Sequence, residues 1–225
     1  MVERWNLVKR YTLLLLGLAI MAVGVGLSIK ADLGTSPISS VPYAVSCFAP
    51  VTVGQATIVM HCAFIAAQIL MLRKKYSLIQ LMQLPVACLF GFLTDLGVWA
   101  VQGIPCGAYW QRWLVCLAGI FLVAVGVSLE VNANVVVLAG EGVVLAVCKV
   151  VPVKFGSMKV AFDVTLVAIA CGLSLAFTGR VQGVREGTLA AAVLVGLTAK
   201  QLGRVWDRWN LAEGAKSDKI STLND

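Results

Sequence analysis

The chain alternates long apolar runs with short polar breaks. Each run holds 18 to 25 residues and few charges, which is the length that an α-helix needs to cross the hydrocarbon core of a bilayer. The pattern therefore predicts an all-α membrane protein with six transmembrane helices. The predicted spans are Tyr11–Ile29, Val51–Leu72, Ser77–Val101, Trp113–Val131, Met158–Thr178 and Thr188–Val205.

The sequence matches itself when it is shifted by 102 positions. Ala22-Val23-Gly24-Val25 then falls on Ala124-Val125-Gly126-Val127. Over residues 22–54, 12 of 33 positions are identical, where this composition gives roughly a tenth by chance. The shift also matches Gly and Pro positions, which set backbone shape. The sequence therefore predicts two copies of one unit, residues 1–107 and 108–206, followed by a polar tail at 207–225.

Three spans in each copy determine how the copies lie in the membrane. Because three is odd, the second copy enters the bilayer from the opposite side, so we expect an inverted repeat with a pseudo-two-fold axis in the membrane plane. Secondary transporters use this arrangement and place their sites near the midplane, where the repeats meet. Alternatively, the duplication produces only a stable membrane scaffold.

Composition and charge support insertion in a membrane. The chain has 225 residues, is 60% apolar and 13% charged, and has a mean hydropathy of +0.90, which excludes an ordinary soluble domain. The net charge of +7 does not indicate a nucleic-acid partner, because the basic residues gather at helix ends. With the N-terminus inside, 14 of the 18 basic residues fall on internal segments. This bias predicts two cytoplasmic termini and a first span retained as a helix rather than cleaved as a signal peptide.

A second kind of segment follows the first span of each copy. It is too apolar for a solvated loop. With about 14 residues between the residues that interrupt it, it is also too short to cross the bilayer. We expect a short helix or a re-entrant hairpin there. Thr35 and Ser36 would then offer hydroxyls and helix-terminal amides to an anionic group. Alternatively, Thr35-Ser36-Pro37 only caps an interfacial helix.

Ionisable residues within the apolar regions are candidates for function, because burying them in a membrane is costly. His61 and Asp163 are equivalent under the 102-residue shift. A Lys159–Asp163 pair, four residues apart, could be purely structural, and a lone histidine is often a packing residue. The residues predicted to line a binding site are Asp32, Thr35, Ser36, His61, Glu141 and Asp163.

The sequence carries no motif of an enzyme or a cofactor site. Its seven cysteines form no CxxC pair, which indicates neither a disulfide framework nor a metal site. Nucleophile elbows, phosphate-binding loops and HExxH are missing from the sequence as well. We therefore expect a protein that is not an enzyme and has no cofactor. Any energy for transport would come from an ion gradient or a partner ATPase.

Several short motifs resemble the YczE/YyaS/YitT-type integral membrane proteins. They are Ala31-Asp32-Leu33-Gly34-Thr35-Ser36-Pro37, Val53-Gly54, Gly140-Glu141-Gly142, Phe155-Gly156, Asp163, Gly183-Val184 and Gly187-Thr188. The resemblance covers roughly Tyr11 to Val205, with Met82-Gln83 where family members tend to carry Gly-Thr. It implies a transporter-like protein of the bacterial cytoplasmic membrane and names no substrate.

The sequence thus favours a carrier of a small solute or ion, embedded in the lipid bilayer. The alternatives are a non-transporting accessory or assembly subunit, and the substrate-capturing subunit of a larger transporter. Expected partners are lipid, a small molecule or ion, and a membrane protein or a second copy of the chain, with no nucleic acid.

Overall fold

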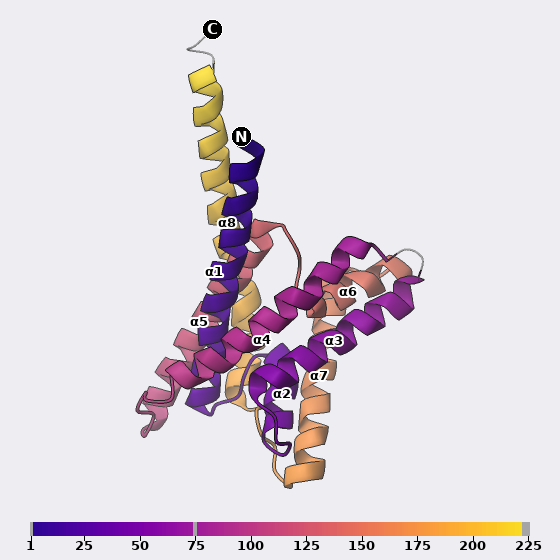
Figure 1. Cartoon of the computed structure of the whole chain (residues 1–225). Helices are drawn as coiled ribbons and strands as arrows, with labels where there is room; N and C mark the ends of the chain where they lie inside the picture. Colours follow the sequence, from indigo (N-terminus) through magenta and orange to yellow (C-terminus); the bar gives the residue numbers. More distant parts are fainter. Residues whose placement is uncertain (1, 74–75, 222–225) are drawn as a thin grey trace.

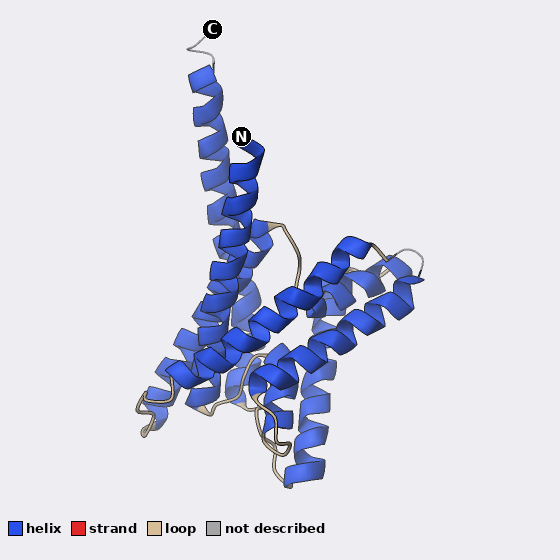
Figure 2. Ribbon diagram, viewed as in Figure 1, coloured by secondary structure: helices blue, strands red, loops and turns tan. Residues whose placement is uncertain are grey.

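The computed structural model describes residues 2–73 and 76–221, with side chains described for 7–73 and 76–205. Within these ranges the secondary structure is entirely helical (Figure 2). The helices are α1 (Val2–Ala31), α2 (Pro37–Ser46), α3 (Val53–Leu72), the 3-10 helix η2 (Leu78–Met82), α4 (Gln83–Ala100), α5 (Tyr109–Ala133), α6 (Ala139–Val150), α7 (Phe155–Thr178) and α8 (Glu186–Ser221).

The order of helices repeats along the chain at the spacing found in the sequence. The starts of α2 and α6, the starts of α3 and α7, and the ends of α1 and α5 are each 102 residues apart. The residues after α1 and α5 also share an unusual backbone. Asp32 has φ 54° and Asn134 has φ 45°, a left-handed conformation that Asp and Asn tolerate better than most residues. The same local turn therefore ends the first helix of each half.

Five helical segments are long and apolar enough to cross a membrane. They are Leu7–Ala31, Val53–Leu72, Leu78–Ala100, Tyr109–Ala133 and Phe155–Thr178, and they coincide with the first five predicted spans. The predicted sixth span lies within α8 but is not among the five, because Lys200 and Arg204 interrupt its apolar run. The helical backbone of α8 continues to Ser221, into the segment predicted as a polar tail.

The third span differs from a continuous helix. It begins with η2 and becomes α-helical only at Gln83. This change of helix type places Pro85 in the first turn of α4, where a missing N–H removes no intrahelical hydrogen bond.

The predicted short helices are present as α2 and α6. They have 10 and 12 residues, or about 15–18 Å of helix, which is too short to cross a bilayer core of about 30 Å. α2 packs against α7, and α6 packs against α3 (Figure 1). Each short helix therefore lies on a long helix of the other half.

The centre of the fold is an antiparallel pair formed by α1 and α5. Arg10, near the start of α1, donates a hydrogen bond to the Ala133 carbonyl at the end of α5, while Lys30 at the end of α1 reaches the Gln102 carbonyl before α5. Between these ends the helices touch through glycines. A Cβ on Gly24 would lie 2.8 Å from the Gly119 carbonyl oxygen, so the two backbones are in direct contact.

The largest difference between the halves is in one helix contact. In the first half α3 packs against α4, where Gly54 faces Gly91 and Asp95 accepts hydrogen bonds from Thr52 Oγ1 at 2.6 Å and the Gly54 N–H at 2.7 Å. In the second half α7 and α8 make little or no contact within the described residues. Figure 1 shows α8 beside α1 and α5, with α7 apart from it.

Gly24→Ala is expected to destabilise the fold, because its methyl group would overlap the backbone of α5. Overpacking of this kind costs about 1–3 kcal/mol. Gly172→Ala is the matched control, since a Cβ at Gly172 meets nothing within 4 Å and alanine favours a helix. Thermal unfolding in detergent should show a lower midpoint for Gly24→Ala and an equal or higher one for Gly172→Ala. Equal midpoints for the two variants would contradict the close contact.

Candidate functional site

A cavity of about 150 Å³ lies among the helices, between the two halves of the chain. Fourteen of its 21 lining residues form seven pairs that are 102 positions apart. The pairs are Met21 and Val123, Val25 and Val127, Ser36 and Leu138, Ser39 and Glu141, Thr57 and Lys159, His61 and Asp163, and Phe90 and Ala192. The same positions of both halves therefore line one shared space.

His61 is the buried polar group that the first half contributes to the cavity wall. It lies on α3 with 1% of its surface exposed, and its ring makes T-shaped contacts with the rings of Phe64 and Phe90, at centroid distances of 6.0 and 6.1 Å. Its Nδ1 atom has no hydrogen-bond partner in the described part of the chain. A buried polar atom without a partner is costly, and this one belongs to a residue that lines the cavity.

The second half contributes the charged groups. On α7, Lys159 Nζ lies 2.5 Å from Asp163 Oδ1, as the spacing of four residues predicts. Glu141, in the first turn of α6, lines the same cavity. Burial raises the pKa of Glu141, the Lys159 ammonium lowers it and the Asp163 carboxylate raises it further. Because burial is the largest of these effects, the net pKa shift of Glu141 is upward, toward the neutral acid.

Glu130 is a buried carboxylate that the sequence prediction did not include among the lining residues. It lies near the end of α5 with 2% of its surface exposed, and its Oε1 atom accepts a hydrogen bond of 2.7 Å from the Leu138 N–H at the start of α6. Glu130 also lines a second cavity of about 320 Å³, together with Gln80, Gln83 and Asn134. In the sequence, Glu130 could have been recognised as an acidic residue inside the apolar run of the fourth predicted span.

Ser36, His61, Glu141 and Asp163 are the predicted residues that the structure brings together at the cavity. Ser36 Oγ donates a hydrogen bond of 3.0 Å to Ser39 Oγ, another lining residue. Its neighbour Thr35 is buried but does not line the cavity.

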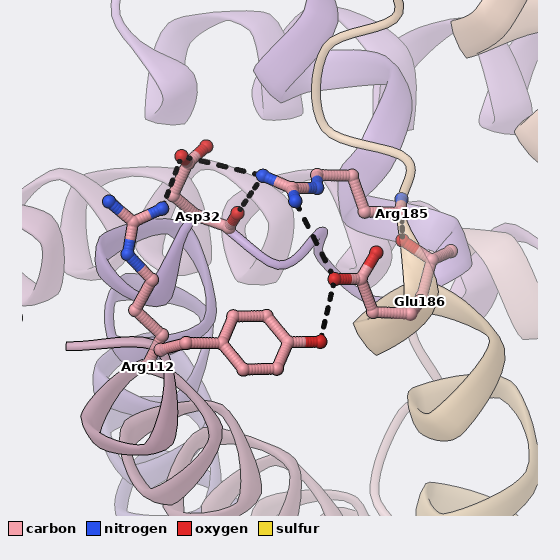
Figure 3. Close-up of polar contacts among 6 residues, drawn as sticks. Asp32, Arg112, Arg185 and Glu186 are labelled. Atoms are coloured by element: carbon pink, nitrogen blue, oxygen red, sulfur yellow. Dashed lines mark hydrogen bonds and ion pairs between the residues drawn. The ribbon is translucent and has the colours of Figure 1, made fainter.

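Asp32 lies away from the cavity, in an ion-pair cluster at the ends of α1, α5 and α8 (Figure 3). Its carboxylate lies 3.1 Å from Arg112 Nη1 and 3.7 Å from Arg185 Nη1, and 62% of its side chain is exposed. Arg185 also donates a 2.9 Å hydrogen bond to the Asp32 carbonyl and pairs with Glu186. In this structure Asp32 joins three helix ends and does not face the cavity.

The described residues contain no group of three or more His, Cys, Asp or Glu side chains placed to hold a metal ion. The cavity lining combines groups that form hydrogen bonds with groups that carry charge. It offers an imidazole nitrogen, hydroxyls, carboxylates and one ammonium, set among apolar side chains.

The Lys159–Asp163 pair is expected to stabilise the fold by mutual neutralisation. Asp163→Asn or Lys159→Met alone leaves one charge in a largely apolar cavity, whereas the double variant removes both. Since the side chains are 31% and 20% exposed, we expect a coupling on the order of 1 kcal/mol in a double-mutant cycle of unfolding in detergent. The control cycle, Asp32→Asn with Arg112→Met, should give a smaller coupling because solvent screens that pair. Additive effects at Lys159 and Asp163 would contradict the expectation.

Comparisons with known proteins place the chain in a family but name no activity. No curated protein and no solved structure gives a significant match. The model of a family of unknown function, DUF6198, matches residues 8–204. The chain therefore belongs to the DUF6198 family.

Proposed function

We propose that this protein is a membrane carrier of a small solute, with its binding site where two inverted copies of one unit meet. In this proposal α8 supplies the sixth span, and α2 and α6 enter the membrane from opposite sides without crossing it. The positive-inside bias supports a location in the bacterial cytoplasmic membrane with both termini in the cytoplasm. The resemblance to YczE/YyaS/YitT-type proteins is consistent with this assignment and stays a prediction.

The antiparallel contact between α1 and α5 supports the inverted relation. Gly17 faces the Gly126 carbonyl and Gly24 faces the Gly119 carbonyl. A shift of 102 positions converts Gly17 to Gly119 and Gly24 to Gly126, so it converts one contact into the other. Two antiparallel helices whose contacts exchange in this way are related by a local two-fold axis perpendicular to them. Such an axis lies in the membrane plane when the helices cross the bilayer.

The observation that carries the proposal is the paired lining of the cavity. Residues at equivalent positions surround a two-fold axis, so a space lined by seven such pairs lies on that axis. Inverted-repeat transporters hold their solute at this place. A scaffold would fill the axis with apolar side chains to gain packing energy. Here the lining instead includes ionisable groups and a buried histidine.

The unequal packing of the two halves is also consistent with a carrier. Such a protein needs two conformations that expose its site to opposite sides. The contact between α3 and α4 and the separation of α7 from α8 are two states of equivalent helix pairs. An exchange of these states would move the opening of the cavity without moving the α1–α5 pair.

Transport by the purified full chain in proteoliposomes tests the proposal. We expect uptake of at least one solute from a panel of labelled amines, carboxylates, sugars and inorganic ions. Asp163→Asn should reduce that uptake about tenfold or more, equivalent to about 1.4 kcal/mol, because it leaves Lys159 without its counter-charge in the site. Glu186→Gln, which removes a carboxylate outside the cavity, should leave uptake unchanged.

Two results would contradict the carrier. One is a panel in which no solute is moved by folded protein. The other is an Asp163→Asn variant that transports as well as the unaltered chain. Co-purification of one membrane protein in fixed stoichiometry, together with the first result, would favour the accessory subunit.

A further inference from the structure

The ionisable groups that line the cavity are mostly acidic. The described lining contains three carboxylates, at Glu130, Glu141 and Asp163, and one ammonium, at Lys159. Lys159 is in direct contact with Asp163, so that pair is neutral as a unit. Two acidic groups remain without a basic partner in the lining, Glu130 on α5 and Glu141 on α6. The lining as a whole therefore favours a cation over an anion.

The rest of the wall is apolar and suits an organic body better than a bare metal ion. Met60, Phe90, Val123 and Val127 are among the lining residues. An inorganic cation needs several oxygen ligands at short range to replace its hydration shell, and the described residues contain no such cluster. An aromatic ring and aliphatic side chains instead bind hydrocarbon groups and, at the ring face, organic cations.

The buried histidine adds a requirement for a hydrogen-bond donor. His61 Nδ1 is without a partner in the described chain, and His61 belongs to the same lining as the two glutamates. A solute that carries N–H groups could donate to the imidazole once the ring turns this nitrogen to the cavity, whereas a carboxylate or a quaternary ammonium could not.

We propose that the cavity binds a protonated organic amine, with its ammonium group directed to Glu141, Glu130 and His61 Nδ1 and its hydrocarbon part against Phe90 and Met60. This inference rests on the proposed carrier function and names the solute class for the same site. The low polarity of the walls strengthens each charge contact compared with water.

Protons compete with the amine for the carboxylates. The titratable groups in the lining are His61 from α3, Glu130 from α5, Glu141 from α6, and Lys159 and Asp163 from α7, while α1, α2, α4 and α8 contribute none. Because burial raises the pKa of Glu141, lowering the pH converts this carboxylate to its neutral form. Amine binding should therefore weaken as the pH falls, and binding at a fixed pH should release protons.

Three probes of nearly equal size separate the charge classes: benzylamine, benzyl alcohol and benzoate. Binding to the full chain in detergent is measured by calorimetry between pH 5.5 and 8, where benzylamine stays protonated. We expect benzylamine to bind at least tenfold more tightly than benzyl alcohol, and benzoate not to bind. Glu141→Gln should weaken benzylamine binding at least tenfold and flatten its pH dependence, while Glu141→Asp, which keeps the charge, should retain most of it. Glu186→Gln is the control and should bind as the unaltered chain does.

The proposal is overturned if benzylamine does not bind, if benzyl alcohol or benzoate binds equally well, or if Glu141→Gln binds benzylamine normally. Where Glu141→Gln fails to fold, the order of the three probes and the pH dependence in the unaltered chain decide the question. Uptake of a carboxylate or a sugar in proteoliposomes would refute the amine class and leave the carrier intact. Uptake of no panel member would refute the carrier itself.

Discussion

The fold depends on the direct backbone contact between α1 and α5. Lipid is as apolar as the side chains of these helices, so burial of apolar surface contributes little to their association, and close van der Waals packing must hold them together. Glycines at positions 17, 24, 119 and 126 allow this approach. The other helices pack around the pair, with α4 on α1 and α8 on α5. The cavity is lined in part by Met21, Val25, Val123 and Val127 of the two central helices.

Much of the architecture follows from two features of the sequence, apolar run length and the 102-residue repeat. Run length predicts six spans, of which five are helices long and apolar enough to cross a membrane, and the repeat predicts a short helix after the first span of each copy. The unequal packing of the halves could not be predicted in this way, because it depends on single differences between copies. Gly91 and Asp95 of α4 correspond to Val193 and Leu197 of α8. In α8 the side chain of Val193 prevents the close approach that Gly91 allows, and Leu197 offers no acceptor in place of Asp95. The second half therefore lacks the close contact and the hydrogen bonds that hold α3 to α4.

The sequence predicts candidate site residues best at positions that meet two criteria. They are equivalent under the repeat, and they hold an ionisable residue within an apolar run. His61 and Asp163 occupy equivalent positions under the 102-residue shift, and both are polar residues within apolar runs. Both also line the cavity. Glu130 has no such partner, because its equivalent is Ser28, and an acid near a helix end is usually solvated. Its burial depends on α6 returning over the end of α5, where the Leu138 N–H meets the carboxylate. Asp32 fits the sequence criteria equally well, yet the left-handed turn that it occupies leads its side chain to Arg112 and Arg185.

The two copies have taken different chemical roles at matching positions. Ser39, Thr57 and His61 in the first half correspond to Glu141, Lys159 and Asp163 in the second, so the ionisable groups of these pairs lie mostly on α6 and α7. Charges need either water or a counter-charge to remain in a membrane. The half with neutral groups closes α3 onto α4, whereas the half with charged groups leaves α7 apart from α8. Closing α7 onto α8 would remove water from Lys159, Asp163 and Glu141, and a cationic solute at Glu141 would offset part of that cost. In the proposed carrier, the half that binds a charged solute would therefore also be the half whose long helices stay apart without it.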